Sequence, residues 1–166
     1  MIITIDGPVA SGKSSAAREL AKALGFQHLD SGAIYRAITL LAYRNGVRGD
    51  DRDAVARLLE SANIIVDDSR TILNGEDVSD AIRLPEVARA VRPFAENPAV
   101  REFVNNLKRG LAAGRDVVIE GRDTGTVIFP DADMKFFLTA SQAERARRRC
   151  EEFKERGTPQ DFQTAV

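Results

Sequence analysis

The stretch GPVASGKSS, residues 7–15, decides the fold of this 166-residue chain. Gly7, four further residues and then Gly12, Lys13 and Ser14 make up a complete phosphate-binding loop pattern. Glycines let the backbone turn several N–H groups toward one anion, and the lysine adds a mobile positive charge for the β- and γ-phosphates. The serine hydroxyl is the usual magnesium ligand in such loops. The pattern therefore predicts a site for a nucleoside triphosphate and Mg²⁺.

The context of the loop supports this interpretation. A β-branched run at residues 2–5 reads as a buried strand, and residues 13–24 carry alanine and leucine at helical spacing before Gly25. A strand, a glycine loop and a helix in this order are the arrangement that the pattern requires. We expect these residues to bind the nucleotide: Gly7, Pro8, Val9, Ala10, Ser11, Gly12, Lys13, Ser14 and Ser15.

The composition is that of an ordinary globular domain. Lys plus Arg number 24 and Asp plus Glu 25, so no global charge favours a nucleic-acid polymer or a membrane surface. One cysteine, Cys150, leaves no internal disulfide and is typical of a reducing cytoplasm. With a single histidine, His28, the chain has no His/Cys cluster for zinc. We expect a cytoplasmic protein, acting as a monomer, that binds its anions at a local site.

The rest of the chain alternates strand and helix patterns. Further strands are expected at residues 26–30, 117–119 and 134–138, and a small antiparallel hairpin at 64–66 and 71–73, joined by the turn 67–70. Further helices are expected at residues 31–46, 51–62, 85–91 and 98–113, with Pro93 and Pro98 separating the last two. A final helix is capped by Ser141, with Glu144 completing a capping box, and ends at Gly157, Thr158 and Pro159.

This pattern predicts an α/β fold with an open, mostly parallel sheet and helices on both faces. In such sheets the site lies at the carboxyl ends of the strands, where DSGAIYR (residues 30–36) and EGRD (residues 120–123) follow two of the expected strands. Guanidinium groups match phosphate bidentately, so Arg36 and Arg122 are candidates to clamp the phosphate of an acceptor opposite the loop. Asp123 is a candidate to accept hydrogen bonds from the acceptor.

Several motifs together resemble one family. GPVASGKSS, LDSGAIYRA, GEDVS, IRLPEV and EGRDTGTVIFPDADMKFFLTAS stand in the order and spacing of bacterial-type cytidylate kinases, and the similarity runs over residues 2–162. The resemblance implies transfer of the γ-phosphoryl group of ATP to CMP or dCMP, with magnesium. It also implies a P-loop nucleoside triphosphate hydrolase-type core at residues 1–62 and 99–166. The monophosphate-binding insert, which contains the hairpin, would then span residues 63–98.

The resemblance also assigns roles to single residues. It implies that Ser31, Arg36 and Arg122 hold the acceptor phosphate, that Arg83 lies near the acceptor, and that Arg101 and Asp123 recognise the cytosine ring. An aspartate there accepts from the cytosine amino group, whereas the carbonyl of uracil would leave it unpaired. Lys13, Arg122 and Asp123 are the expected catalytic residues, and Glu120 is expected to help position the magnesium shell.

The chain departs from the family pattern in two places. Arg92 stands where many members have a serine that touches the base, and the sequence stops at Val166, inside the expected lid at residues 157–166. If the chain ends there, we expect phosphate binding to persist while catalysis falls severely, because lid closure excludes water and completes the charge clamp. Two alternatives therefore stay open: a nucleotide-binding fragment without turnover, and a P-loop kinase of another small acceptor such as AMP or UMP.

Overall fold

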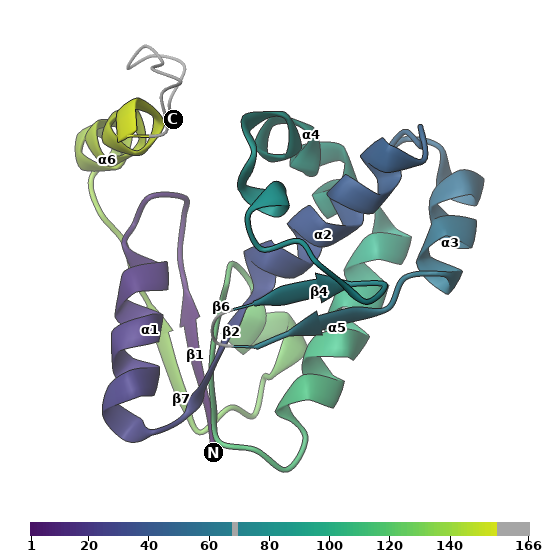
Figure 1. Cartoon of the computed structure of the whole chain (residues 1–166). Helices are drawn as coiled ribbons and strands as arrows, with labels where there is room; N and C mark the ends of the chain where they lie inside the picture. The colour runs from purple at the N-terminus through teal and green to yellow at the C-terminus, as the bar shows by residue number, and fades with distance from the viewer. Residues whose placement is uncertain (68–69, 156–166) are drawn as a thin grey trace.

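A four-stranded parallel sheet in the order β2-β6-β1-β7 lies at the centre of the computed structural model, which describes residues 1–67 and 70–155 (Figure 1). Its strands are β1 (Ile2–Asp6), β2 (Gln27–Asp30), β6 (Val117–Gly121) and β7 (Met134–Phe137). In the register of the sheet, Ile3 of β1 lies opposite Val118 on one side and Met134 on the other. The prediction of an open parallel sheet is confirmed.

Helices cover both faces of this sheet because the side chains of β6 alternate between them. Val118 packs with Ile3 and Ile5 of β1 against α1 (Lys13–Leu24). The flanking residues Val117 and Ile119 point the opposite way, toward the C-terminal turn of α5 (Pro98–Ala112). A strand that is apolar on both faces is the pattern of a parallel sheet buried between two helical layers.

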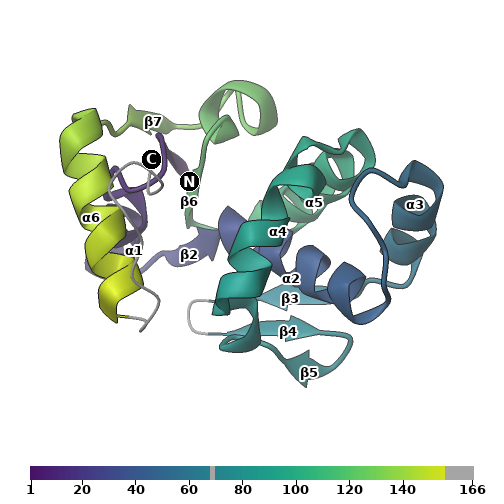
Figure 2. The same cartoon turned by 90° about the horizontal axis from the view of Figure 1, so that it is seen from above.

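A second group of elements packs around a larger apolar cluster, and Figure 2 shows these elements beside the parallel sheet. These elements are α2 (Ser31–Arg44), α3 (Arg52–Glu60), β3 (Ile64–Val66), β4 (Thr71–Leu73), β5 (Glu76–Asp77), the 3₁₀ turn η1 (Ala81–Arg83), α4 (Pro85–Glu96) and α5. The two predicted hairpin strands are confirmed, and β5 adds a third antiparallel strand beside β4. The cluster joins residues of α2, α3 and α5 to residues between positions 63 and 98, so the boundaries proposed for the insert remain a prediction.

One helix boundary was predicted wrongly. Pro93 lies inside α4, which continues to Glu96 instead of ending near residue 91. Val87 and Phe94, two turns apart on one face of α4, are both buried, and their packing outweighs the lost hydrogen bond of the proline. Pro98, by contrast, begins α5, as predicted, in the first-turn position where proline is tolerated.

The last described helix, α6 (Gln142–Glu155), begins after a serine cap. The Ser141 hydroxyl accepts a hydrogen bond from the backbone N–H of Glu144 at 3.2 Å, as predicted, while the Glu144 carboxylate bonds Arg147 and Arg148. The predicted end of this helix, the expected lid at residues 157–166, and turn residues 68 and 69 lie outside the described residues. Within residues 1–67 and 70–155, no helix is long and apolar enough to cross a membrane.

Candidate functional site

The phosphate loop connects β1 to α1 at the carboxyl end of the sheet. Gly12 has φ of 93° immediately before α1, a left-handed conformation that glycine adopts without strain. At Gly7 a Cβ atom would lie 2.1 Å from the Leu138 carbonyl oxygen, so only glycine fits where the chain leaves β1. The two glycines therefore shape the loop for different reasons, one for its backbone angle and the other for a close approach to the end of β7.

Lys13 holds its ammonium group over this loop. Its Nζ atom donates to the Pro8 carbonyl oxygen at 3.1 Å. Burial lowers the pKa of Lys13 from its usual value, and the negative charge of Glu120 opposes that shift. The Ser11 hydroxyl is buried and has no hydrogen-bond partner among the described residues. A cation, an unpaired hydroxyl and the N-terminus of α1 thus converge where a phosphate group fits.

Glu120 lies at the centre of the site and joins three elements. Its Oε2 atom accepts from the Ser14 hydroxyl at 2.5 Å, and its Oε1 atom lies 3.2 Å from His28 Nε2. The Ser31 hydroxyl donates to the backbone oxygen of the same residue. Glu120 is only 3% exposed: its carboxylate is held between α1 and β2, and its backbone oxygen is held by the start of α2.

The hydroxyl of Ser14 and the carboxylate of Glu120 are hard oxygen donors of the kind that Mg²⁺ prefers. Among the described residues, no group of three or more His, Cys, Asp or Glu is arranged to hold a metal ion. Magnesium is usually bound through one or two protein oxygens, with phosphates and water as the remaining ligands. The residues present therefore fit a magnesium ion that arrives with a nucleotide.

The DSGAIYR motif crosses from β2 into α2 and fixes one arginine. Asp30 caps α2: its Oδ1 atom accepts from the Ala33 N–H at 3.1 Å, and its Oδ2 atom lies 3.0 Å from Arg36 Nη2. The Nε atom of Arg36 is buried without a hydrogen-bond partner in the described part of the chain. One edge of the guanidinium group is thus held by Asp30, and an N–H group remains for a ligand.

The residues after β6 supply a second charged group. Asp123 forms an ion pair with Arg101 of α5, and both side chains are partly exposed. Arg122 is exposed, and its charge contributes to lowering the pKa of Lys13, which places it on the side of the phosphate loop. Arg101 is one of the residues that line a surface hollow of about 450 Å³ along α5.

Two predicted residues lie apart from these contacts. Arg83, in η1, is exposed, and no side-chain hydrogen bond or ion pair joins it to the other candidates within residues 1–67 and 70–155. Arg92 pairs with Glu96 on the exposed face of α4 at 2.8 Å. The structure therefore brings Lys13, Ser14, Ser31, Arg36, Arg101, Arg122 and Asp123 to one edge of the sheet, and leaves Arg83 unconnected to them.

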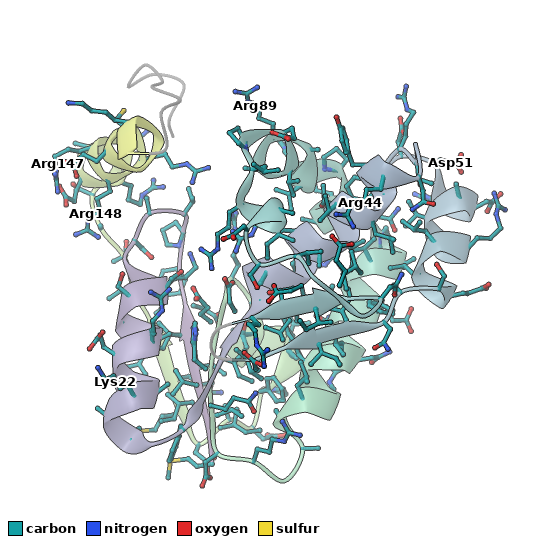
Figure 3. The ribbon with its side chains drawn as sticks, in the orientation of Figure 1. Lys22, Arg44, Asp51, Arg89, Arg147 and Arg148 are labelled. Carbon is teal, nitrogen blue, oxygen red and sulfur yellow. The ribbon has the colours of Figure 1, made fainter. Side chains whose placement is uncertain are left out.

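Sequence reasoning missed two residues with direct contacts at this edge. The Asp6 carboxylate, at the end of β1, accepts from the N–H groups of Thr124 and Gly125 at 2.9 and 2.7 Å, which fixes the π-helical turn η2 (Thr124–Ile128). Arg148 of α6 reaches the loop: its Nη1 atom lies 3.5 Å from the Ala10 carbonyl oxygen (Figure 3). The position of Asp6 at the end of a predicted strand was a usable sequence signal. Arg148 had no such signal, because it is one of several arginines in a basic run.

Lys108 is the third residue that sequence reasoning missed, and it is only 2% exposed. Its Nζ atom lies 5.9 Å from the centre of the Tyr35 ring. Burial lowers the pKa of Lys108 to about 8, against the opposing effect of Asp123 and Asp6. The signal for Lys108 was its place in a stripe of buried α5 residues at four-residue spacing: Val100, Val104, Lys108 and Ala112.

Comparison with known proteins shows the family to which the chain is similar. The cytidylate kinase family profile matches residues 3–166. A cytidylate kinase of Caldanaerobacter subterraneus subsp. tengcongensis is 47% identical over 164 residues, which cover 99% of this chain and 73% of that protein. A cytidylate kinase of Pelotomaculum thermopropionicum is 51% identical over 160 residues, covering 93% of this chain and 71% of the relative. The span matched by the family profile contains the positions of all the site residues described above.

Proposed function

Because this chain belongs to the cytidylate kinase family, we propose that it transfers the γ-phosphoryl group of ATP to CMP or dCMP, giving ADP and CDP or dCDP. The observation that carries the proposal is the meeting of a phosphate loop with the DSGAIYR and EGRD motifs at one edge of a parallel sheet. Donor and acceptor phosphates need to be aligned there for an in-line transfer.

On the donor side, the loop N–H groups and the N-terminus of α1 bind the phosphates of ATP. Lys13 places a positive charge beside the transferred group, where charge spreads over the phosphoryl oxygens during transfer. Ser14 would be the direct ligand of magnesium, and Glu120 would orient both Ser14 and the water around the ion. Magnesium, when bound, neutralises part of the charge of the β- and γ-phosphates.

On the acceptor side, we assign Arg36, Arg122 and Ser31 to the phosphate of CMP. Arg36 is supported by its fixed edge on Asp30 and by its unpaired Nε atom. Arg83, which is exposed at the end of η1, keeps its proposed place near the acceptor. These arginines supply positive charge that offsets the approach of two phosphate groups.

Base recognition is assigned to Arg101 and Asp123. Asp123 accepts from Arg101 through one carboxylate oxygen, Oδ2, which leaves its other oxygen for the amino group of cytosine. Uracil offers a carbonyl oxygen at that position, so the Asp123 carboxylate would face another acceptor without a proton between them. The proposed site therefore favours CMP and dCMP over UMP. We further propose that the protein acts as a monomer in the cytoplasm.

The test is an ADP-release assay with ATP, magnesium and a panel of CMP, dCMP, UMP and AMP. We expect ADP release to depend on CMP or dCMP, and Lys13→Ala to reduce kcat by at least about 100-fold, because the transition state loses its nearest cation. Lys22→Ala is the matched control, since Lys22 is exposed in the last turn of α1 (Figure 3). Release that depends on AMP alone, or ADP release that no monophosphate increases, would overturn the proposal.

A further inference from the structure

The elements from α2 to α5 form the acceptor half of the molecule, and this half contains a buried cation to which the proposed reaction gives no role. Lys108 is the largest of the fully buried side chains, and it lies among the apolar residues that anchor α5. Lysine is almost never fully buried unless it is paired. Within residues 1–67 and 70–155, however, Lys108 forms no ion pair. A helix that needed only an apolar contact at this position would be better served by methionine or leucine.

The ammonium group of Lys108 points toward the acceptor site. Its Nζ atom lies over the ring of Tyr35, a residue of the DSGAIYR motif in α2. The charged groups close enough to influence it come from four elements: Asp6 at the end of β1, Asp30 at the end of β2, Asp123 after β6, and Arg101 on α5. Three of these four are carboxylates at the carboxyl ends of the parallel strands, where the acceptor is proposed to bind.

Each of these carboxylates already has a closer partner. Asp6 accepts two backbone N–H groups, Asp30 pairs with Arg36, and Asp123 pairs with Arg101. The positive charge of Lys108 is therefore not neutralised by a pairing with any one of these carboxylates. Its buried ammonium group adds a positive potential to all three carboxylates, and water screens this charge less than it would screen a charge at the surface.

We propose that Lys108 is a positioning residue for the acceptor: its protonated side chain holds Tyr35 and the Asp123–Arg101 pair in place and attracts the acceptor phosphate from below. The inference rests on the proposed function, since it assumes that the acceptor is a nucleoside monophosphate. It adds a residue to the site, and it predicts that acceptor binding weakens when Lys108 loses its proton.

The groups around Lys108 allow its loss of a proton to be observed between pH 7 and 9.5. Burial lowers the pKa of Lys108 to about 8, whereas burial raises the pKa of Tyr35 above its usual value of 10, and Asp123 raises that of Arg101. The phosphate of CMP has its second pKa near 6, so the ligand does not titrate between pH 7 and 9.5. The other amine with a lowered pKa is Lys13, in the donor loop.

The experiment measures the dissociation constant of CMP by calorimetry at pH 7, 8 and 9.5, without ATP. We expect the constant of the unmodified protein to rise about tenfold over this range, the effect of one charge at close range in a partly screened site. Lys108→Arg keeps its charge at every pH, so we expect tight binding without the pH dependence. Lys108→Met has no charge, so we expect weak binding, again independent of pH.

Lys22→Met is the control, because it removes an exposed lysine and should follow the unmodified protein at every pH. A purely structural role for Lys108 predicts a different result, in which both Lys108 variants keep the pH dependence of the unmodified protein. That result, or a constant that does not change with pH in the unmodified protein, overturns the inference. If a Lys108 variant does not fold, the pH series of the unmodified protein and of the other variant decides.

The same measurement separates the two proposals. Failure of the unmodified protein to bind CMP at pH 7 overturns the proposed function and the role of Lys108 together. Binding of CMP that is unaffected by both pH and Lys108 overturns only the inference. Loss of the pH dependence in Lys13→Met, together with its retention in Lys108→Arg, assigns the titration to the donor loop and also overturns the inference.

Discussion

Asp123 is the residue on which the choice of acceptor base depends. Its carboxylate only accepts hydrogen bonds, and one oxygen is held by Arg101. We predict that Asp123→Asn lowers kcat/KM for CMP by roughly 10- to 100-fold, because a hydrogen bond to a charged group is lost. The effect on UMP should be much smaller, since an amide can donate to the uracil carbonyl after a rotation of its side chain.

The measurement is the ratio of kcat/KM for CMP to that for UMP in the variant and the parent. Asp131→Asn is the matched control, because Asp131 is an exposed carboxylate in the loop before β7. An unchanged ratio in Asp123→Asn would contradict the assignment of this residue to the base.

Single residues show where sequence reasoning succeeds and where it fails. Lys13, Ser14 and Arg36 were predictable because short motifs fix their spacing and the chemistry of phosphate binding fixes their type. Lys108 was missed because a lysine in a helix is usually a solvated residue, although its four-residue spacing with apolar residues of α5 was a usable signal. The Asp123–Arg101 pair joins residues 22 positions apart, and the sequence carries no spacing rule for such a contact.

At the scale of elements, α3 offers a test of stability that does not disturb the site. Asp51 caps this helix by accepting from the Ala54 N–H at 3.0 Å, and α3 lies on the outer side of the acceptor half (Figures 1 and 3). We predict that Asp51→Ala lowers the free energy of unfolding by about 1 kcal/mol, the usual value of an N-cap. Phosphoryl transfer to CMP should be unaffected.

The measurement is urea unfolding followed by circular dichroism. Asp53→Ala in the first turn of the same helix removes a carboxylate but leaves the cap in place, so we expect a smaller loss. Equal losses in the two variants would mean that charge near the helix end, and not the capping bond, stabilises α3.

Element boundaries were predictable where local chemistry determines them. The strands of the hairpin carry β-branched residues around a polar turn, and both were predicted with the bounds that the structure has. Strand β5 was missed because Glu76 and Asp77 have no apolar pattern and owe their conformation to pairing with β4. Helix α4 was predicted too short, since the burial of Phe94 beyond Pro93 depends on a partner distant in sequence.

For the whole molecule, Lys108 links stability to pH. Its pKa is lowered from 10.5 in the unfolded chain to about 8 in the folded protein. Between these values the unfolded state binds more protons, so the contribution of Lys108 to the free energy of unfolding rises with pH. Below about pH 8 the full free-energy cost of burying the charged lysine applies, and the shift in its pKa corresponds to about 3 kcal/mol.

We therefore predict that Lys108→Met, which removes the charge with little change in volume, raises the free energy of unfolding at pH 7 by up to about 3 kcal/mol. The difference from the parent should shrink between pH 8 and 10.5. Urea unfolding of both proteins at pH 7 and 10 measures it, with Lys22→Met as the control for an exposed lysine. A variant less stable than the parent at pH 7 would show that the surrounding carboxylates more than offset the burial of this cation.

The strand order of the central sheet has a consequence for the time course of folding. β1 pairs only with β6 and β7 among the described strands. Ile3 therefore cannot form its sheet contacts before Val118 and Met134, more than a hundred residues later, have been synthesised. The antiparallel strands β3, β4 and β5, by contrast, pair with neighbours a few residues away. Contacts between distant residues form slowly because a long loop has to be closed first. We expect the acceptor half to begin folding early during synthesis, while the first residues made, including the phosphate loop, are among the last to reach their final conformation.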